Sequence, residues 1–338
     1  MDNIRKKEDL LKVNDLEVSF FTHAGEVKAV RKVSYNLKYG EAMGIVGESG
    51  SGKSVSSYAL MGIIPEPGKV IGGNINFENK EIINMSESEM QKLRGKEVGM
   101  IFQDPMTSLN PVFTVGSQID ESLKKHTDLN KQERKKRVIE LFELVGINQP
   151  EKRYKQYPHE FSGGMRQRVM IAMALACNPK LLIADEPTTA LDVTIQAQII
   201  ELLKELKEKI NMSIIFITHD LGVISEICDK VAVMYAGNII ERGTIDDIFY
   251  NPKHPYTMGL LKSIPKINND EHDRLIPIEG NPVDLINPPK GCSFAPRCEH
   301  CMNVCMENVP PVYEIDGNHQ ASCWLLVKEE FEREEGVV

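Results

Sequence analysis

Residues 47–54 read Gly-Glu-Ser-Gly-Ser-Gly-Lys-Ser and match the phosphate-loop pattern Gly-x-x-x-x-Gly-Lys-Ser. A triphosphate needs backbone N–H groups that point inward with no Cβ in the way, which is why glycines suit this stretch. Lys53 supplies a charge to the β- and γ-phosphates, and the Ser54 hydroxyl can bind Mg²⁺. Residues 41–47 read as a strand and residues 54–64 as a helix. That context distinguishes a phosphate loop from an ordinary glycine-rich turn.

Two adjacent carboxylates follow the apolar run 181–184. Asp185 is suited to hold Mg²⁺ at the end of a buried strand. Glu186 can polarise an attacking water as a general base. Two neighbouring acids can also form a solvated turn, but the buried strand and the phosphate loop in the same chain favour the catalytic interpretation.

A second anion-binding helix start is predicted at Phe161-Ser-Gly-Gly-Met165. Ser162 and the two glycine N–H groups after it would begin the helix over residues 162–176. His219 follows the apolar run 214–217, so it lies at a strand end where it could reach a γ-phosphate. A lone histidine is usually structural, and only the other motifs in the chain make His219 a candidate catalytic residue.

The composition is that of an ordinary globular protein. The 338 residues are 41% hydrophobic and 26% charged, enough for one ATPase domain with an appendix. The net charge of −9 argues against a nucleic-acid-binding protein. No signal peptide is visible, and the longest apolar run, residues 169–177, is far shorter than the ~20 residues that cross a bilayer. We therefore expect a cytoplasmic protein that meets a membrane only through partners.

Strand and helix patterns alternate over the first 250 residues. This alternation predicts an α/β fold, a P-loop core with a mixed sheet, and a closing hairpin. Leu16, Val18 and Phe20 share one face of an early strand. The buried strands are expected at residues 98–102, 181–184 and 214–217, a helix at 196–209, and the hairpin at 231–235 and 239–242.

Two further segments stand apart from this core. Residues 115–125 and 131–145 have helical spacing with charged outer faces, which predicts a helical subdomain at about 112–160 inserted into the sheet. Beyond residue 250 the regular patterning fades and prolines accumulate. We therefore expect an ATP-binding domain over residues 1–250 and a separate extension over 251–338.

Five of the seven cysteines fall in that extension. Five, six and seventeen residues separate the successive cysteines Cys292, Cys298, Cys305 and Cys323, and Cys301 forms an extra Cys-x-x-Cys pair with Cys298. Four thiolates can hold zinc or an iron–sulfur cluster, and the spacing alone does not decide between them or exclude free thiols. Phe294, Pro296 and Arg297 lie between the first two cysteines. His319 is a possible substitute ligand, although a surface polar residue is the expected alternative.

Taken in order, these motifs resemble the ATP-binding subunit of an ABC transporter, and the match runs over roughly residues 13–250. The resemblance implies that Gln103 is the Q-loop glutamine, residues 162–164 the signature, Asp192 the D-loop aspartate and His219 the switch histidine. It also implies that the adenine stacks on Phe20, with Phe21 as the fallback. Met165 stands where the commoner signature has glutamine.

The resemblance assigns three groups of residues. Glu186 and His219 are the catalytic pair. The Mg²⁺ ligands are Ser54, Gln103 and Asp185. The nucleotide is expected to contact Phe20, Gly47, Ser49, Gly50, Ser51, Gly52, Lys53, Ser54, Val55, Gln103, Ser162, Gly163, Gly164 and Asp192.

Three longer motifs narrow the family. They are the stretches 103–111, 161–168 and 254–261, and together they are similar to the dipeptide/oligopeptide and nickel import ATPases. The similarity implies a [4Fe–4S] cluster on Cys292, Cys298, Cys305 and Cys323, with Cys301 spare and zinc as the alternative.

The same similarity implies partners and a location. The expected partners are a second ATPase subunit, favoured to be a paralogue, two permease subunits and, indirectly, a peptide-binding protein outside the cell. The expected location is the cytoplasmic face of the inner membrane. The alternative is a soluble ABC ATPase of DNA repair or translation with a cysteine-metal insert. It is less favoured, because a second cassette and a long coiled coil are missing from the sequence.

Overall fold

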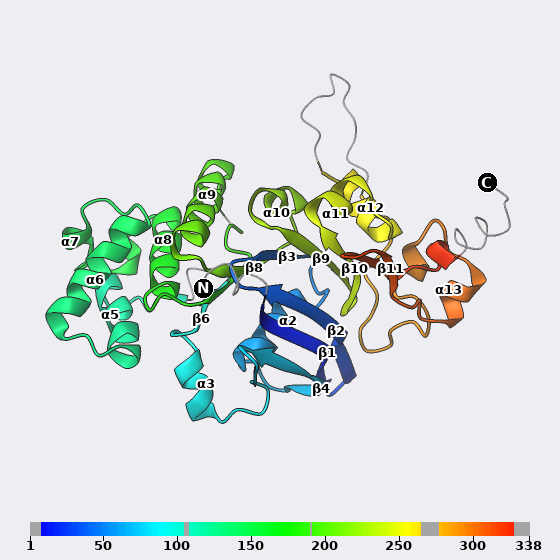
Figure 1. The fold of residues 1–338 in the computed structure, drawn as a ribbon, viewed down its shortest axis with the longest axis horizontal. Helices are drawn as coiled ribbons and strands as arrows, with labels where there is room; N and C mark the ends of the chain where they lie inside the picture. The colour runs from blue at the N-terminus through cyan, green and yellow to red at the C-terminus, as the bar shows by residue number, and fades with distance from the viewer. Residues whose placement is uncertain (1–7, 105–107, 190, 265–276, 328–338) are drawn as a thin grey trace, which may run out of the picture. The chain divides into compact units, whose positions relative to one another are not determined.

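A computed structural model describes residues 8–104, 108–189, 191–264 and 277–327 (Figure 1). Residues 105–107 of the Gln103–Pro111 motif and Ala190 of the D-loop stretch lie outside the described residues. The chain forms two compact units. The first consists of residues up to Leu11, Leu37–Ala42 and Phe77–Ile217, and the second of Lys12–Asn36, Met43–Asn76 and the chain from Thr218 onward.

Three parallel strands form the centre of the first unit. They are β6 (Val98–Ile101), β7 (Leu181–Asp185) and β8 (Ser213–Thr218), with β7 between the other two. Every residue of these strands is buried, as expected for apolar runs covered on both faces. Because parallel strands end at the same edge, Asp185 and the residues after it lie at a common edge with the end of β8.

The helices of this unit have clear capping signals. Thr114 caps α5, and Asn130 caps α6 in a reciprocal pair with Glu133, so both expected helices are confirmed at their predicted starts. The Arg134–Asp120 ion pair of 2.8 Å joins α6 to α5. The helices are α3 (Glu87–Leu93), α5 (Val115–His126), α6 (Lys131–Leu144), α7 (Pro150–Arg153), η1 (Pro158–Glu160), α8 (Gly163–Ala174) and α9 (Val193–Ile210), and β5 covers Lys80–Glu81.

The second unit contains one sheet of long strands, in which β1 lies between β2 and β4. Leu16 and Val18 are fully buried, whereas Phe20 is only partly buried. The strands are β1 (Asp9–Thr22), β2 (Gly25–Lys38) and β4 (Gly68–Phe77).

A mixed sheet also belongs to the second unit. Its strand β3 (Ala42–Val46) pairs in parallel with β9 (Lys230–Tyr235), and β9 pairs antiparallel with β10 (Asn238–Thr244). The turn Ala236-Gly237 has positive φ at both residues, so the predicted closing hairpin is confirmed. The helices of this unit are α2 (Lys53–Met61), α10 (Leu221–Ile227), α11 (Ile245–Tyr250), α12 (Pro255–Lys262), η2 (Ala295–Arg297) and α13 (Asn303–Glu307).

The C-terminal extension contains more regular structure than its sequence indicates. Strand β12 (His319–Ala321) pairs antiparallel with β10, and β11 (Tyr313–Asp316) pairs with β12 (Figure 1). These strands are too short to show a period in the sequence, and the available edge of β10 specifies them instead. Among the residues that the structure describes, no helix is both long enough and apolar enough to span a bilayer.

Candidate functional site

The phosphate loop lies between the end of β3 and the start of α2, as the motif predicts. Gly52 has φ of 98°, and a Cβ there would collide with the carbonyl oxygen of Ala29. A Cβ on Gly47 would collide with the carbonyl oxygen of Met234. The glycines are therefore required by the packing of the loop against neighbouring strands as well as by access for a phosphate chain.

Lys53 is folded back onto this loop. Its Nζ donates to the carbonyl oxygens of Gly47 at 2.7 Å and Glu48 at 2.9 Å, and the residue is 5% exposed. The cation therefore lies inside the loop at the N-terminus of α2, where an anion is favoured.

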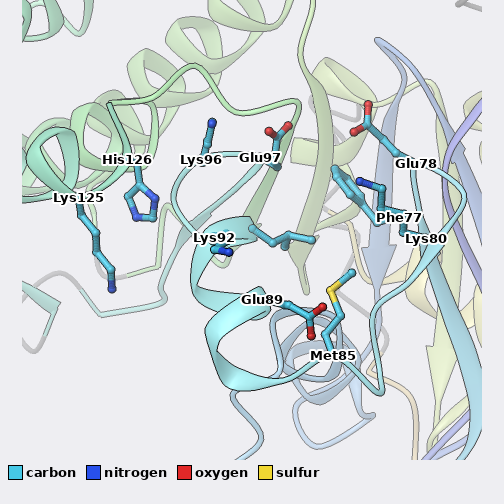
Figure 2. Close-up of a pocket in the computed structure, with 11 residues that line it drawn as sticks. Phe77, Glu78, Lys80, Met85, Glu89, Lys92, Lys96, Glu97, Lys125 and His126 are labelled. Carbon is cyan, nitrogen blue, oxygen red and sulfur yellow. The ribbon is translucent and has the colours of Figure 1, made fainter. Parts of the chain in front are cut away.

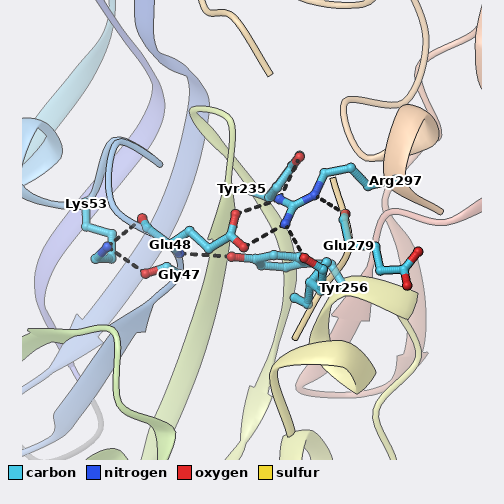
Figure 3. A network of polar contacts seen from close by, with 8 residues as sticks. Gly47, Glu48, Lys53, Tyr235, Tyr256, Glu279 and Arg297 are labelled. Carbon is cyan, nitrogen blue, oxygen red and sulfur yellow. Dashed lines mark hydrogen bonds and ion pairs between the residues drawn. The ribbon is translucent and has the colours of Figure 1, made fainter. Parts of the chain in front are cut away.

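Glu48 connects the phosphate loop to the C-terminal extension (Figure 3). Its carboxylate accepts two hydrogen bonds from Arg297, at 2.7 and 3.0 Å. Its backbone N–H donates to the Tyr256 hydroxyl at 2.9 Å. The Glu48 carboxylate raises the pKa of the Arg297 guanidinium above its usual value. Sequence reasoning did not assign this contact, and the only signal was an arginine between two cysteines.

In the first unit, Glu186 is held by two side-chain donors. Its Oε2 accepts from Gln103 Nε2 and from Thr189 Oγ1, each at 2.9 Å. Its backbone has φ of 46°, a left-handed conformation that is costly for a residue with a side chain. Asp185 is fully buried at the end of β7. The structure thus brings Gln103 and Glu186 together, a contact that the sequence did not predict.

The signature and D-loop stretches also meet in the first unit. The Ser162 hydroxyl caps α8 by accepting from the Met165 N–H, so the methionine at this position contributes only its backbone. Asp192 caps α9 by accepting from Ile195 N–H at 2.9 Å. A Cβ on Gly164 would lie 2.8 Å from Ile195, so the two helix starts are packed together. Ser162, Gly163 and Asp192 are exposed.

The remaining predicted nucleotide contacts lie in the second unit. A Cβ on Gly68 would lie 2.6 Å from the Phe20 ring, so this ring packs over a glycine, whereas Phe21 is 49% exposed. His219 is exposed directly after β8. Ser49 and Gly50 line a cavity of about 300 Å³ beside the phosphate loop, as does Ser51, while Val55 is partly buried in the first turn of α2.

The donor set proposed for Mg²⁺ consists of oxygen atoms. A hydroxyl, an amide carbonyl and a carboxylate are hard ligands of the kind that Mg²⁺ prefers, so Ser54, Gln103 and Asp185 fit this ion chemically.

The cysteines of the extension lie close enough together to influence one another's pKa. Burial, with a smaller contribution from neighbouring thiols, raises the pKa of Cys298 to about 11 and that of Cys323 to about 12. The Cys292 N–H donates to the Cys305 carbonyl at 2.8 Å, and Cys301 is exposed. Within the described part of the chain, no group of three or more histidine, cysteine or acidic side chains is arranged to hold a metal ion. The expected [4Fe–4S] site therefore gains no support from this arrangement.

His319 is not a surface residue, and that expectation was wrong. It is fully buried, and its Nε2 lies 2.8 Å from Glu241 Oε1. Glu241 also accepts from the backbone N–H groups of Lys253 and His254. The imidazole belongs to a buried cluster that joins β12 to β10, because a buried carboxylate requires such partners.

A second cavity lies in the first unit, away from these motifs (Figure 2). Its volume is about 490 Å³, and its lining mixes lysines and glutamates around Phe77 and Met85. None of the described residues that line it belongs to a motif discussed above, and the opposed charges indicate no single ligand class.

Comparisons with known proteins agree with the motifs. The family model described as ABC transporter matches residues 30–189, and the model described as Oligopeptide/dipeptide transporter, C-terminal region, matches residues 240–305. The oligopeptide transport ATP-binding protein OppD of Bacillus subtilis (strain 168) is 60% identical over 318 residues, which is 94% of this chain and 89% of that protein. The dipeptide transport ATP-binding protein DppD of the same organism is 54% identical over 319 residues, covering 94% and 95%.

A solved structure is also similar. It is the dimeric, post-hydrolysis state of the ATP-binding cassette MJ0796 bound to ADP and Pi, with 27% identity and a TM-score of 0.63. The match covers 70% of this chain and 98% of that one.

Proposed function

Because this chain belongs to the family of oligopeptide and dipeptide ABC transport ATP-binding proteins, we propose a residue-level account of how it hydrolyses ATP to drive peptide import. The observation that carries the account is the Glu186 carboxylate, held by Gln103 and Thr189 on a strained backbone. Backbone strain of this kind is concentrated at active sites, where the surrounding structure holds it in place.

The phosphate loop binds the triphosphate. Lys53 exchanges the carbonyls of Gly47 and Glu48 for the β- and γ-phosphates, since a cation prefers phosphate oxygens to neutral carbonyls. The N–H groups from Gly50 to Val55 surround the phosphates, and the adenine stacks on Phe20. Ser54, Gln103 and Asp185 would hold Mg²⁺, which would neutralise part of the phosphate charge.

Glu186 is the general base that polarises the attacking water. The hydrogen bonds from Gln103 and Thr189 fix the direction in which its carboxylate points, and an oriented base is the requirement for in-line attack. His219, exposed after β8, contacts the γ-phosphate.

Catalysis requires a second ATPase subunit. Ser162 and Gly163 are exposed at the start of α8 and Gly164 is partly buried, and such a helix start is suited to complete the phosphate site of a partner chain. The dimeric state of the similar cassette MJ0796 supports this proposal. The partner is a paralogue, and Asp192 faces it.

Permease subunits dock on the first unit. Val112 is 71% and Phe113 55% exposed, which is unusual for apolar residues that lie close in the chain. Phe113 also lines a cavity of about 700 Å³ together with Arg94, Gln118 and Met173. A permease segment seated there anchors the subunit at the cytoplasmic face of the membrane, and a peptide-binding protein delivers the cargo from outside.

The domain division is proposed at about residue 250. The two family models match separate stretches, residues 30–189 and 240–305, which supports an ATP-binding domain followed by an extension, with the second match beginning at residue 240, before the proposed boundary. The charged outer faces of α5 and α6 support a helical subdomain at about 112–160.

An iron–sulfur cluster on the four cysteines rests on family resemblance alone. Anaerobic purification followed by iron, sulfide and zinc analysis tests it. Iron and sulfide in equal amounts with visible absorption would support the cluster, and a colourless protein with stoichiometric zinc would exclude it.

Reconstitution tests the transport function itself. The subunit is assembled with the permeases and binding protein encoded beside it, and ATP hydrolysis is measured with dipeptides, oligopeptides or Ni²⁺. Stimulation by peptide is expected. Hydrolysis that responds to DNA or ribosomes and not to peptide would favour the DNA-repair or translation alternative instead.

A further inference from the structure

We propose that Arg297 is a positioning residue of the phosphate loop, and that the C-terminal extension thereby forms part of the nucleotide site. The inference rests on the proposed binding of ATP by residues 47–54. It adds a residue that no motif of the ATP-binding domain contains, because Arg297 lies 249 positions after its partner Glu48.

The contact is a two-pronged ion pair. Arg297 Nη1 and Nη2 donate to the two oxygens of the Glu48 carboxylate at 2.7 and 3.0 Å, and the Arg297 side chain is 3% exposed. Paired N–H groups in a planar fork fix the orientation of a carboxylate as well as its distance. The pair is therefore unlike an exposed salt bridge, whose mobile side chains would hold nothing in place.

Glu48 is restrained at each of its polar groups. Its N–H donates to Tyr256, its carboxylate accepts from Arg297, and its carbonyl oxygen accepts from Lys53 Nζ. When Lys53 turns toward a phosphate, that carbonyl contact is lost. Arg297 and Tyr256 then keep Glu48, and with it the first half of the loop, in the conformation that receives the ligand.

Arg297 is itself fixed to the sheet. Its Nε donates to the Glu279 carbonyl at 2.9 Å, and its other nitrogens reach the Ile278 carbonyl and the Tyr235 hydroxyl at the end of β9 (Figure 3). Phe294, three residues earlier, packs edge-on against Tyr235 at 5.3 Å between ring centroids. An anchor of this kind can restrain a glycine-rich loop, which has little conformational preference of its own.

The extension also lines the cavity beside the phosphate loop. Residues 282–285 line the cavity of about 300 Å³ together with residues 48–51. The Leu285 carbonyl accepts from the Lys28 N–H at 3.0 Å, so this segment is tied to β2. Two separate parts of the extension therefore border the phosphate loop.

The test compares Arg297→Gln with Glu48→Gln, the double variant and the control Arg242→Gln. Arg242 on β10 donates to Gln320 of the extension and to the Ser34 carbonyl of β2, and neither partner belongs to the phosphate loop. Binding of the fluorescent analogue mant-ATP with Mg²⁺ is measured on the full chain, together with hydrogen exchange of residues 47–54 and the melting temperature. Arg297→Gln is expected to weaken binding about 5- to 30-fold and to speed exchange in the loop.

Glu48→Gln is expected to give a similar loss, and the double variant no more than either single change, because both break one interaction. Arg242→Gln should bind within about two-fold of the wild type. If Arg297→Gln does not fold, Arg297→Lys is the variant to measure. It keeps the charge but loses the planar fork, so its affinity should lie between those of the wild type and Glu48→Gln. Wild-type affinity in a folded Arg297 variant, or additive losses in the double variant, would overturn the proposal.

The titrations would give a different result if the proposed binding of ATP itself were wrong. In that case the wild-type chain would not bind mant-ATP, and Lys53→Ala would change nothing. The two outcomes are therefore separable in one set of titrations.

Discussion

Gln103 and Glu186 lie 83 residues apart in sequence, and their side chains share a hydrogen bond of 2.9 Å. Because the Gln103 amide donates to the carboxylate, the glutamine orients the proposed base in this conformation. If Mg²⁺ binds the amide oxygen of Gln103, as proposed, the N–H that donates to Glu186 belongs to the same planar amide, so the metal and the base would share one side chain. Gln103 is thus in a position to report the state of the nucleotide to the base.

Replacing Glu186 by glutamine should abolish turnover while ATP binding persists. The amide keeps the shape of the side chain but cannot accept the proton of the attacking water, so kcat should fall by at least about 100-fold. ATP hydrolysis by the assembled transporter and retention of labelled ATP measure the two effects. Near-normal hydrolysis by this variant would assign the base to another residue.

Removing the Gln103 side chain should lower kcat more than it weakens ATP binding. Gln103→Ala deletes one of the two donors that orient Glu186, and a misdirected base costs about ten-fold or more in rate. The exposed Gln132 on α6 provides a matched control as Gln132→Ala. Equal losses in the two variants would mean that the contact with Glu186 has no catalytic weight.

Lys53→Ala should weaken both ATP binding and turnover. Its ammonium is the cation buried within the loop, and the loss of a charge-assisted contact to phosphate costs about 1.5–3 kcal/mol. Titration with mant-ATP and steady-state hydrolysis give the two values. Intact ATP binding together with lost turnover would mean that Lys53 stabilises only the transition state and not bound ATP.

His254 should make the protein less stable in mild acid. Burial lowers its pKa to about 4, and its Nδ1 accepts from the Tyr256 N–H at 3.1 Å. Between pH 6.5 and 4 the unfolded chain therefore binds a proton that the folded chain does not. The free energy of unfolding should fall as the pH drops through this window, by up to about 1.4 kcal/mol per pH unit.

Urea denaturation at several pH values measures this slope. His254→Asn should make it shallower, because asparagine can cap α12 without titrating, whereas the exposed His23→Asn should leave it unchanged. An unchanged slope in His254→Asn would mean that another group controls the acid sensitivity.

The elements with strong local signals were predictable from the sequence. Apolar runs predicted β6, β7 and β8, and helical spacing with charged outer faces predicted α5 and α6, whose capping residues Thr114 and Asn130 are seen in the structure. The phosphate loop was predictable because its glycines meet a local backbone requirement. The resemblance placed Gln103 and Glu186 in one nucleotide site, but the hydrogen bond between their side chains is known only from the structure.

The contacts of the extension were not predictable. His319 looked like a surface residue because the sequence around it is polar, yet it is buried against Glu241. Arg297 was visible only as an arginine between cysteines. Both positions depend on partners tens to hundreds of residues away, and a single sequence contains no information about such pairing.

The burial of Glu241 affects how the protein folds while the ribosome is synthesising it. Its carboxylate emerges with β10, but the imidazole that it binds is made 78 residues later. Until then only the backbone N–H groups of Lys253 and His254 can donate to this carboxylate, so its burial costs more free energy than in the finished chain. The second unit, with its phosphate loop, should therefore finish folding only after translation has passed residue 319. A ribosome stalled earlier would display a chain that already carries the whole Gly-x-x-x-x-Gly-Lys-Ser motif and does not yet hold nucleotide well.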